Sequence, residues 1–283
     1  MKVRTRSFLL LLELVGFAVQ VGWAQSPSEM WIPIKLKDGF LVIANGSVGS
    51  LGNLTFLIDT GTSRTLMDSR IIKQLELTGV ADKLTAFDRE VDAKRVTLPD
   101  LHLGGIHAES PQVIATDLSG VAQRFGIQTD AVIGMDILRL GQFDIDYNSR
   151  RIWFSGGEPM ASLLPVESGN EPYLIVKARI DNTPITLMID TGCDGIMLFA
   201  NRVPNGLKRS YSASHTSTVF GEVPVTQIGS GKLSTGTTPA HTVRFHIVET
   251  GNNRMGFDGI LGVRALHASR IRFDFEQMAV SWR

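Results

Sequence analysis

The triplet Asp-Thr-Gly occurs twice in this chain of 283 residues, at positions 59–61 and 190–192. Two carboxyl groups held a few ångströms apart resist double ionisation, so they share one proton and titrate as a pair. The ionised member can then activate a water molecule while the protonated member polarises a carbonyl group. Asp59 and Asp190, once brought together, would therefore hydrolyse an amide bond without a metal ion, a thiol or a serine.

The other two residues of each triplet suit the same chemistry. Gly61 and Gly192 carry no side chain, so the backbone at these positions can approach a partner closely. The hydroxyl groups of Thr60 and Thr191 can form hydrogen bonds to the opposite loop. Each triplet also follows an apolar run that would bury one side of its carboxylate. Two such loops that meet about a local twofold axis would make one site from two half-sites.

The elements that must position the triplets are repeated as well. Each half of the chain has an apolar run well before its triplet, a second run directly before it, an apolar-apolar-Gly segment after it and a closing segment. The paired segments are 40–43 and 173–176, 54–58 and 185–189, 132–138 and 260–266, and 143–147 and 271–275. Four landmarks that keep their register with a nearly constant offset indicate an internal duplication.

Between these landmarks lie short Val, Ile, Leu and Phe runs separated by Asp-Gly, Asn-Gly and Gly-Gly turn signals. The sequence therefore predicts a mostly β protein in two similar lobes. Helical periodicity is confined to residues 68–77, 131–140 (after Gly134) and 263–268. The expected divisions are a signal peptide at 1–24, an N-terminal lobe at 25–157, a linker at 158–163 and a C-terminal lobe at 164–283.

The first 24 residues have the composition of a cleaved secretory signal. Lys2, Arg4 and Arg6 precede a long apolar stretch, and residues 22–24 (Gly-Trp-Ala) come just before polar residues. An uncleaved anchor is the weaker alternative, because Glu13 would place an ionisable group within the membrane at considerable cost. We therefore expect export, either to a periplasm or into the medium, and no stable membrane span after cleavage.

Composition argues against several classes of partner and cofactor. The chain has 28 Lys and Arg against 28 Asp and Glu, so it lacks the basic excess typical of nucleic-acid binding. The single cysteine, Cys193, cannot form an intrachain disulfide and has no histidine near it in sequence, so we interpret it as a small buried residue and not as a nucleophile. The six histidines show no His-Glu-x-x-His or comparable spacing, so we expect no metal ion and no other cofactor.

Two further motifs carry little weight. Residues 144–146, Asp-Ile-Asp, invite comparison with calcium ligands, but their counterpart at 272–274 lacks the first Asp, and a strand edge is the favoured interpretation. Residues 229–232, Gly-Ser-Gly-Lys, resemble part of a phosphate loop. They lack both its earlier Gly and its final Ser or Thr, so we assign them no binding role.

The doubled triplets and their surrounding segments together resemble the pepsin and retropepsin superfamily of aspartic proteases. The similarity covers nearly the whole chain after the signal, and the compact, similar halves look like a retropepsin dimer joined into one polypeptide. The resemblance implies the acid-protease fold, in which two β-barrel-like lobes flank an active-site cleft that binds an extended peptide or protein. Because both carboxylates belong to one chain, the active form would be a monomer. The resemblance implies Asp59 and Asp190 as the catalytic dyad, with support from Thr60, Gly61, Thr62, Thr191, Gly192, Gly134 and Gly262.

The chain departs from the family pattern on one side of the dyad. Thr62 and Ser63 follow the first triplet, whereas Cys193 and Asp194 follow the second, so a hydroxyl group adjoins only one carboxylate. We therefore expect the two catalytic aspartates to differ in proton affinity, with the assignment of acid and base left open. A pairing of Arg264 with Asp194 is one further expectation.

Two other family features are altered. Met135 and Val263 occupy the positions at which retropepsins carry an arginine, so the Arg-Asp brace of that family is missing in its usual form. The expected first-lobe flap, at about residues 84–97 by hairpin spacing, contains no tyrosine. The Ser/Thr-rich segment 211–221 is the candidate for a second, mobile flap.

Two other functions are compatible with the same residues. A peptide- or protein-binding module that kept the fold but lost useful catalysis would explain the unequal flanks and the absent flap tyrosine. The two intact aspartates argue against it, because close carboxylates repel each other and cost stability unless a proton is retained. A hydrolase that cuts a proenzyme or regulatory partner at a single site would look inert on generic substrates.

Overall fold

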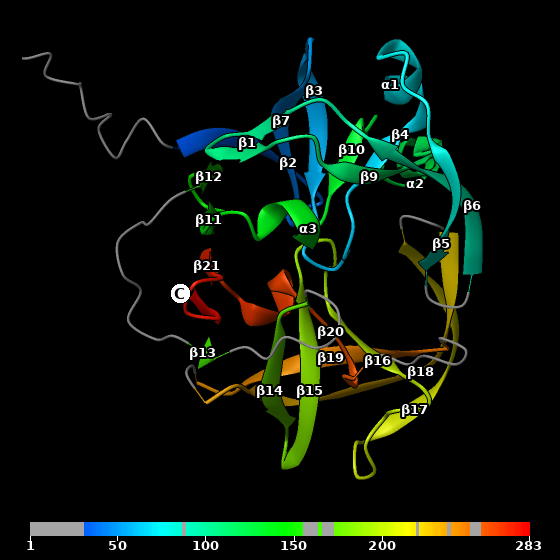
Figure 1. The fold of residues 1–283 in the computed structure, drawn as a ribbon. Coiled ribbons are helices and arrows are strands. Elements are labelled where there is room, and N and C mark those ends of the chain that lie inside the picture. The colour runs from blue at the N-terminus through cyan, green and yellow to red at the C-terminus, as the bar shows by residue number, and fades with distance from the viewer. Residues whose placement is uncertain are drawn as a thin grey trace, which may run out of the picture.

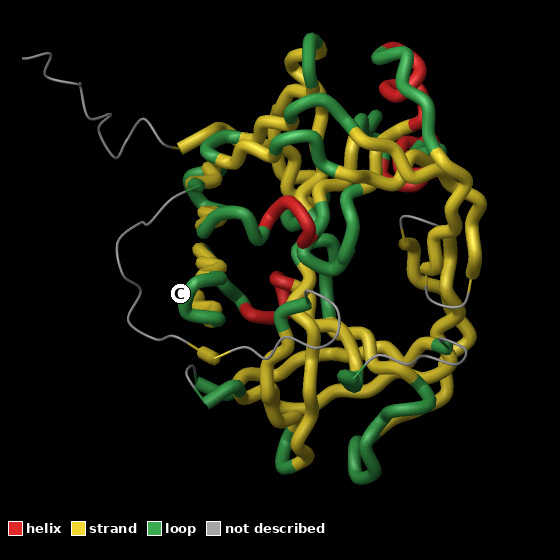
Figure 2. Tube along the Cα trace, viewed as in Figure 1, coloured by secondary structure: helices red, strands yellow, loops and turns green. Residues whose placement is uncertain are grey.

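Two β-rich lobes, with a sheet shared between them, make up the protein (Figure 1). The computed structural model describes residues 31–86, 89–154, 164–165, 173–218, 221–236, 239–249 and 256–283. The expected signal peptide at 1–24 and linker at 158–163 lie outside the described residues. Within the described residues, helices are few and short, and strands dominate, as Figure 2 shows. The expectation of a mostly β protein in two lobes is therefore confirmed.

The first half of the chain contributes twelve strands and three short helices, in chain order β1 (Trp31–Lys37), β2 (Leu41–Val48), β3 (Leu51–Ile58), β4 (Leu66–Asp68), α1 (Ser69–Gln74), β5 (Val80–Ala86), β6 (Arg89–Thr97), β7 (Leu101–Leu103), β8 (Ile106–Ala108), β9 (Gln112–Thr116), α2 (Ser119–Phe125), β10 (Ala131–Ile133), α3 (Met135–Leu138), β11 (Phe143–Asp146) and β12 (Arg151–Trp153). The second half contributes β13 (Leu164–Pro165), β14 (Ile175–Ile180), β15 (Thr183–Asp190), β16 (Ile196–Phe199), β17 (Arg209–Thr218), β18 (Gly221–Ser234), β19 (His241–Val248), β20 (Gly259–Gly262), the 3-10 helix η2 (Val263–Leu266), β21 (Arg270–Asp274) and β22 (Ala279–Trp282).

The two lobes repeat one arrangement of four strands. In the first lobe β3 pairs in parallel with β10, β10 pairs antiparallel with β4, and β4 pairs in parallel with β9. In the second lobe β15, β20, β16 and β19 follow in the same order with the same directions. The triplet-bearing strands β3 and β15 are therefore equivalent, and the duplication inferred from sequence is visible in the topology.

The second lobe closes into a barrel, because β14, at one end of the strand order β14-β15-β20-β16-β19-β18, also pairs with β18. The first lobe forms a larger open sheet in the order β1-β2-β3-β10-β4-β9-β6-β5. Strand β3 lies inside that sheet, between β2 and β10, and its residues 56–58 are all fully or almost fully buried. This burial on both faces accounts for the unbroken apolar run before the triplet.

Strands from both lobes meet in one sheet, in which β11 of the first half pairs with β21 of the second. Asp144 on β11 is buried and accepts hydrogen bonds from two buried arginines on β21, Arg270 and Arg272. The expectation of a strand edge at residues 144–146 is wrong, because β11 lies between β12 and β21. The sequence analysis did not associate these two arginines with Asp144. Their hydrogen bonds use both oxygens of its carboxylate.

The three expected helical segments are present as α1, α3 and η2. Helix α1 begins directly after Asp68, whose side chain accepts a hydrogen bond from the backbone N–H of Arg70 and so caps the helix. Helix α2 was not expected, since it is short and contains Gly120, which weakens the helical signal. None of the helices in the described parts of the chain is long and apolar enough to cross a membrane.

Candidate active site

Asp59 and Asp190 lie together where the C-terminal ends of β3 and β15 meet between the lobes. Both residues are buried, with 6% and 9% of their surface exposed, and each carboxyl group shifts the pKa of the other. The backbone N–H of Asp59 donates to the carbonyl oxygen of Ile133 on β10, which fixes the end of β3 against its neighbouring strand. The structure thus unites the two residues that were predicted to form the dyad.

The two threonines of the triplets bond the loops to each other. The Thr60 hydroxyl donates to the carbonyl of Ile189 at 2.9 Å and accepts from the backbone N–H of Thr191 at 3.1 Å. Thr191 makes the reciprocal pair, donating to the carbonyl of Ile58 at 2.9 Å and accepting from the N–H of Thr60 at 3.0 Å. Both side chains are fully buried. Four buried hydrogen bonds therefore fix each carboxylate relative to the other lobe.

The two triplet glycines are required by the closeness of the carboxylates. A Cβ atom on Gly61 would lie 2.4 Å from the carboxyl carbon of Asp190, and one on Gly192 would lie 2.9 Å from that of Asp59. Real Cβ atoms do not approach other atoms this closely. Each glycine thus makes room for the carboxyl group of the opposite lobe, as predicted from the triplets.

The later glycines, Gly134 and Gly262, pack against the backbone of the loops that follow the two triplets. A Cβ on Gly134 would lie 2.7 Å from the carbonyl oxygen of Thr62, and one on Gly262 would lie 2.4 Å from that of Cys193. In both lobes, therefore, the segment that follows the parallel strand packs directly beneath the loop that follows the aspartate. Such contact is possible only without a side chain.

A partly buried carboxylate that the sequence analysis did not single out holds the first-lobe loop. Asp136 accepts hydrogen bonds from the backbone N–H and the hydroxyl of Thr65 at 2.9 and 2.7 Å. The Thr65 hydroxyl in turn accepts from the N–H of Gly134 at 3.0 Å. The only signal in the sequence was the acidic residue shortly after Gly134, in a position where the second half has Arg264.

The second lobe uses a different pair at the equivalent place. Arg264 Nε lies 3.2 Å from Asp194 Oδ1, and both side chains are more than half exposed. The expected pairing of these residues is therefore present, but an exposed ion pair of this kind contributes only about 0–1 kcal/mol. The loop that carries Asp190 is thus held less firmly than the loop that carries Asp59.

The hydrogen-bond donors around the carboxyl groups of Asp59 and Asp190 are unequal. Asp59 accepts from the backbone N–H of Gly61 at 2.8 Å and from the hydroxyl of Thr62 at 2.9 Å. Asp190 accepts from the N–H of Gly192 at 2.6 Å, and the residue that corresponds to Thr62 is Cys193. The asymmetry expected from the flanking residues is therefore also present in the hydrogen bonds.

Unequal donors separate the proton affinities of the pair. Burial raises the pKa of Asp59, but the hydrogen bonds from Asp190, Thr62 and Gly61 oppose that rise. Burial also raises the pKa of Asp190 well above its ordinary value, and the negative charge of Asp59 raises it further. Asp190 is thus the member that holds the shared proton and Asp59 the member that is ionised.

Cys193 lies in the wall of the cleft beside Asp190. Its side chain is buried, and its thiol is within 3.4 Å of the carbonyl oxygen of Gly195. Burial, followed by the charge of Asp190, raises the pKa of this thiol well above its usual value. A thiol that resists ionisation is a poor nucleophile. The interpretation of Cys193 as a small buried residue is confirmed.

The dyad opens into a cavity of about 800 Å³ that residues of both lobes line. Apolar side chains come from the first lobe through Phe40, Leu84 and Phe125, and from the second through Met188, Met197, Phe199 and Ile260. The cavity therefore presents an apolar wall on each side of two carboxyl groups. Its size exceeds that needed for one side chain of a bound molecule.

Two hairpins flank the cavity, one from each lobe. Strands β5 and β6 form the first and strands β17 and β18 the second, and Figure 1 places both on the same side of the molecule, reaching toward each other. Leu84 of the first hairpin and residues 216–218 of the second line the cavity. Both segments that were expected to be flaps are therefore parts of hairpins. Tyr211 of the second hairpin is 83% exposed and is not part of the cavity wall.

The fold and the dyad agree with a family comparison. The family model described as "Aspartyl protease" matches residues 44–137 and 176–265, which together exceed half of the chain. Each match falls within one lobe. The chain therefore belongs to the aspartyl protease family, with two repeated, retropepsin-like regions in a single polypeptide. A search of curated proteins returned no match.

Proposed function

We propose that the protein is an aspartic endopeptidase that hydrolyses peptide bonds with a water molecule activated by Asp59 and Asp190. The observation that supports this most strongly is the pair of buried carboxyl groups at the floor of a cleft, each lying directly against the triplet glycine of the opposite lobe. Burial of two like charges is costly unless a proton is kept between them. A site that retains such a pair suits chemistry better than a purely binding role.

In the proposed reaction the two aspartates have different roles. Asp59 accepts a proton from the water as the water oxygen attacks the peptide carbonyl carbon, while Asp190 gives its proton to the carbonyl oxygen. The tetrahedral intermediate then collapses. The C–N bond breaks as Asp59 passes its proton to the amide nitrogen, and one hydroxyl proton of the intermediate returns to Asp190.

The proposed substrate is an extended peptide or a segment of a protein that lies between the lobes. The apolar walls of the cleft suit apolar side chains, and the two hairpins offer backbone groups for main-chain hydrogen bonds.

We propose a monomeric active form, since one chain supplies both carboxylates. Export directed by residues 1–24 is part of the same proposal, and sequencing the N-terminus of the mature protein from fractionated cells tests it.

Replacement of each catalytic carboxyl group tests the proposed reaction. Asp59→Asn and Asp190→Asn keep the shape of the side chain but remove the ability to share a proton. Each should lower kcat by at least about a thousandfold, because neither half of the dyad works alone. Cleavage of a diverse peptide library, read by mass spectrometry over a range of pH, measures the effect. Asp146→Asn, on β11 and outside the cleft lining, is the matched control.

The same experiment separates the alternatives. Wild-type protein that binds library peptides without cutting them would favour the binding module, for which the unequal flanks at Thr62 and Cys193 are the supporting observation. Cleavage of one sequence among many would favour a hydrolase dedicated to a single site. Near wild-type turnover by either Asn variant would disprove the shared dyad.

A further inference from the structure

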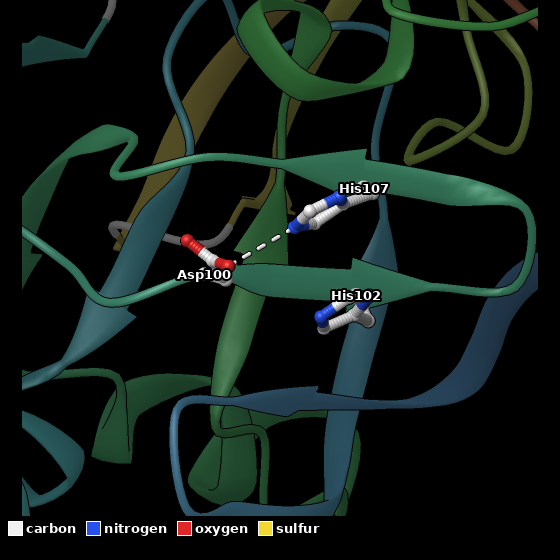
Figure 3. A group of neighbouring side chains, drawn as sticks. All are labelled: Asp100, His102 and His107. Carbon is white, nitrogen blue, oxygen red and sulfur yellow. Dashed lines mark hydrogen bonds and ion pairs between the residues drawn. The ribbon is translucent and has the colours of Figure 1, made fainter.

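Three exposed side chains of the first lobe lie close together outside the lining of the cleft: Asp100 directly before β7, His102 on β7 and His107 on β8. Their potential ligand atoms all lie within 4.8 Å of one another. Figure 3 shows them on the β7–β8 hairpin, with Asp100 directed at His107. No role in the proposed peptidase accounts for them, and the spacing of the histidines along the chain did not indicate that they meet.

The hairpin itself forces the two histidines onto one face. Leu101, Leu103, Ile106 and Ala108 alternate with the histidines and are all buried, so the histidines between them must point to solvent. In the antiparallel register His102 is directly opposite His107. The two imidazole rings stack in parallel, with their centroids 4.3 Å apart.

The backbone beneath this face is held at both ends. Strand β7 pairs with β2, and the backbone N–H of Gly49 donates to the carbonyl oxygen of Asp100 at 2.9 Å. At the turn, Gly104 has a positive φ of 55°, and a Cβ on Gly105 would lie 2.6 Å from the carbonyl oxygen of Phe154. The hairpin is therefore anchored against the core, and the positions of the three side chains are largely set before any ligand arrives.

The third member completes a set of donors. Asp100 Oδ2 lies 3.2 Å from His107 Nε2. Two ligand atoms of a tetrahedral zinc ion with bonds of about 2.0–2.1 Å are separated by roughly 3.3–3.4 Å, so this pair already has the spacing of one edge of the tetrahedron. His102 is exposed and can change its ring orientation to supply the third nitrogen.

We propose that Asp100, His102 and His107 form a surface site for a divalent transition-metal ion of the zinc type. Two imidazole nitrogens and one carboxylate oxygen are ligands that zinc accepts, whereas magnesium and calcium prefer all-oxygen sets. Three protein ligands leave the fourth position to water or to an external donor. The bound ion ties residue 100 to the hairpin and stabilises the folded first lobe, because the unfolded chain does not hold these ligands together.

Zinc titration of the untagged, chelator-treated protein near neutral pH tests the site. Isothermal titration calorimetry should show one zinc ion per chain, and thermal unfolding should move to higher temperature when zinc is added. The His102→Ala/His107→Ala variant should lose both effects. Its fold in the absence of metal should be unchanged, since both side chains are exposed. His215→Ala removes an exposed histidine from β17 and should keep both effects.

A graded variant and other ions sharpen the result. Asp100→Asn should weaken zinc binding by at least about tenfold. Loss of a residue that only hydrogen-bonds to a metal ligand already costs about that much, and Asp100 is proposed as a ligand itself. Magnesium and calcium should give no comparable heat. Failure of the wild type to bind zinc, an unchanged isotherm in the double-histidine variant, or binding that is lost instead in Asp59→Asn would each overturn the proposal.

Discussion

Thr62 and Cys193 follow the two triplets at equivalent positions, yet only Thr62 donates a hydrogen bond to the aspartate of its own triplet. A donor favours the ionised form of its partner. This single hydroxyl therefore helps to decide which carboxyl group is ionised and can accept a proton from water, and which one holds the shared proton. One residue thus gives the two halves of the duplicated site different proton affinities.

Removal of that hydroxyl should alter the pH dependence of the proposed reaction. The Thr62 hydrogen bond lowers the pKa of Asp59 against the opposing effect of burial. Thr62→Val keeps the shape but removes the donor, so the pKa of Asp59 should rise, less of it should be ionised at acidic pH, and the acid limb of kcat/KM should move to higher pH. On that limb the loss should be about tenfold, the equivalent of one charge-assisted hydrogen bond.

The matched control for this change is the neighbouring hydroxyl. Ser63→Ala leaves Asp190, Thr62 and Gly61, the groups that act on Asp59, unchanged, so the acid limb of this variant should coincide with that of the wild type. A profile for Thr62→Val that is lowered equally at every pH would contradict the proposed role of Thr62 in setting the proton affinity of Asp59.

At the scale of elements, the sequence predicted what local pattern determines. The apolar runs before the triplets became β3 and β15, and the segments around Gly134 and Gly262 became the short strands and helices beneath them. Helix α2 escaped prediction because its 7 residues, about two turns, show little periodicity. Contacts between distant residues also escaped, because the pairing of Asp144 with arginines on β21 depends on strand order and not on neighbours in the chain.

The crossed threonines allow a prediction at the same scale. Thr191→Val removes a hydroxyl that bonds to Ile58 and Thr60 of the other loop, and it leaves both backbone groups without that buried partner. Each unsatisfied group costs about 1–3 kcal/mol, so the loss of both should lower the free energy of unfolding by roughly 2–6 kcal/mol. Urea denaturation measures this, and kcat should fall as the loops lose their register. Thr191→Ser restores the hydroxyl and should recover most of both quantities.

For the whole molecule, the cleft depends on how firmly the two lobes are joined. Beyond the crossed threonines, the shared sheet joins β11 to β21 and buries the carboxylate of Asp144 between Arg270 and Arg272. Arg270 also lies over the ring of Trp31 on β1, at 5.2 Å from its centroid. Asp59 and Asp190 come from loops of different lobes, so they meet only if the two lobes keep their relative position. The buried charges on β11 and β21 help to fix that position.

Asp144→Asn should therefore weaken the protein as a whole. It leaves two buried arginines without their shared counter-charge, and breaking a buried pair in this way costs about 3–5 kcal/mol. Asp194→Asn breaks the exposed pair with Arg264 and should cost no more than about 1 kcal/mol. Urea denaturation of both variants at low and high salt provides the comparison. Added salt should weaken the wild-type contribution of the exposed pair and leave the buried one nearly unchanged. Equal losses in the two variants would show that the charges on β11 and β21 do not hold the lobes together.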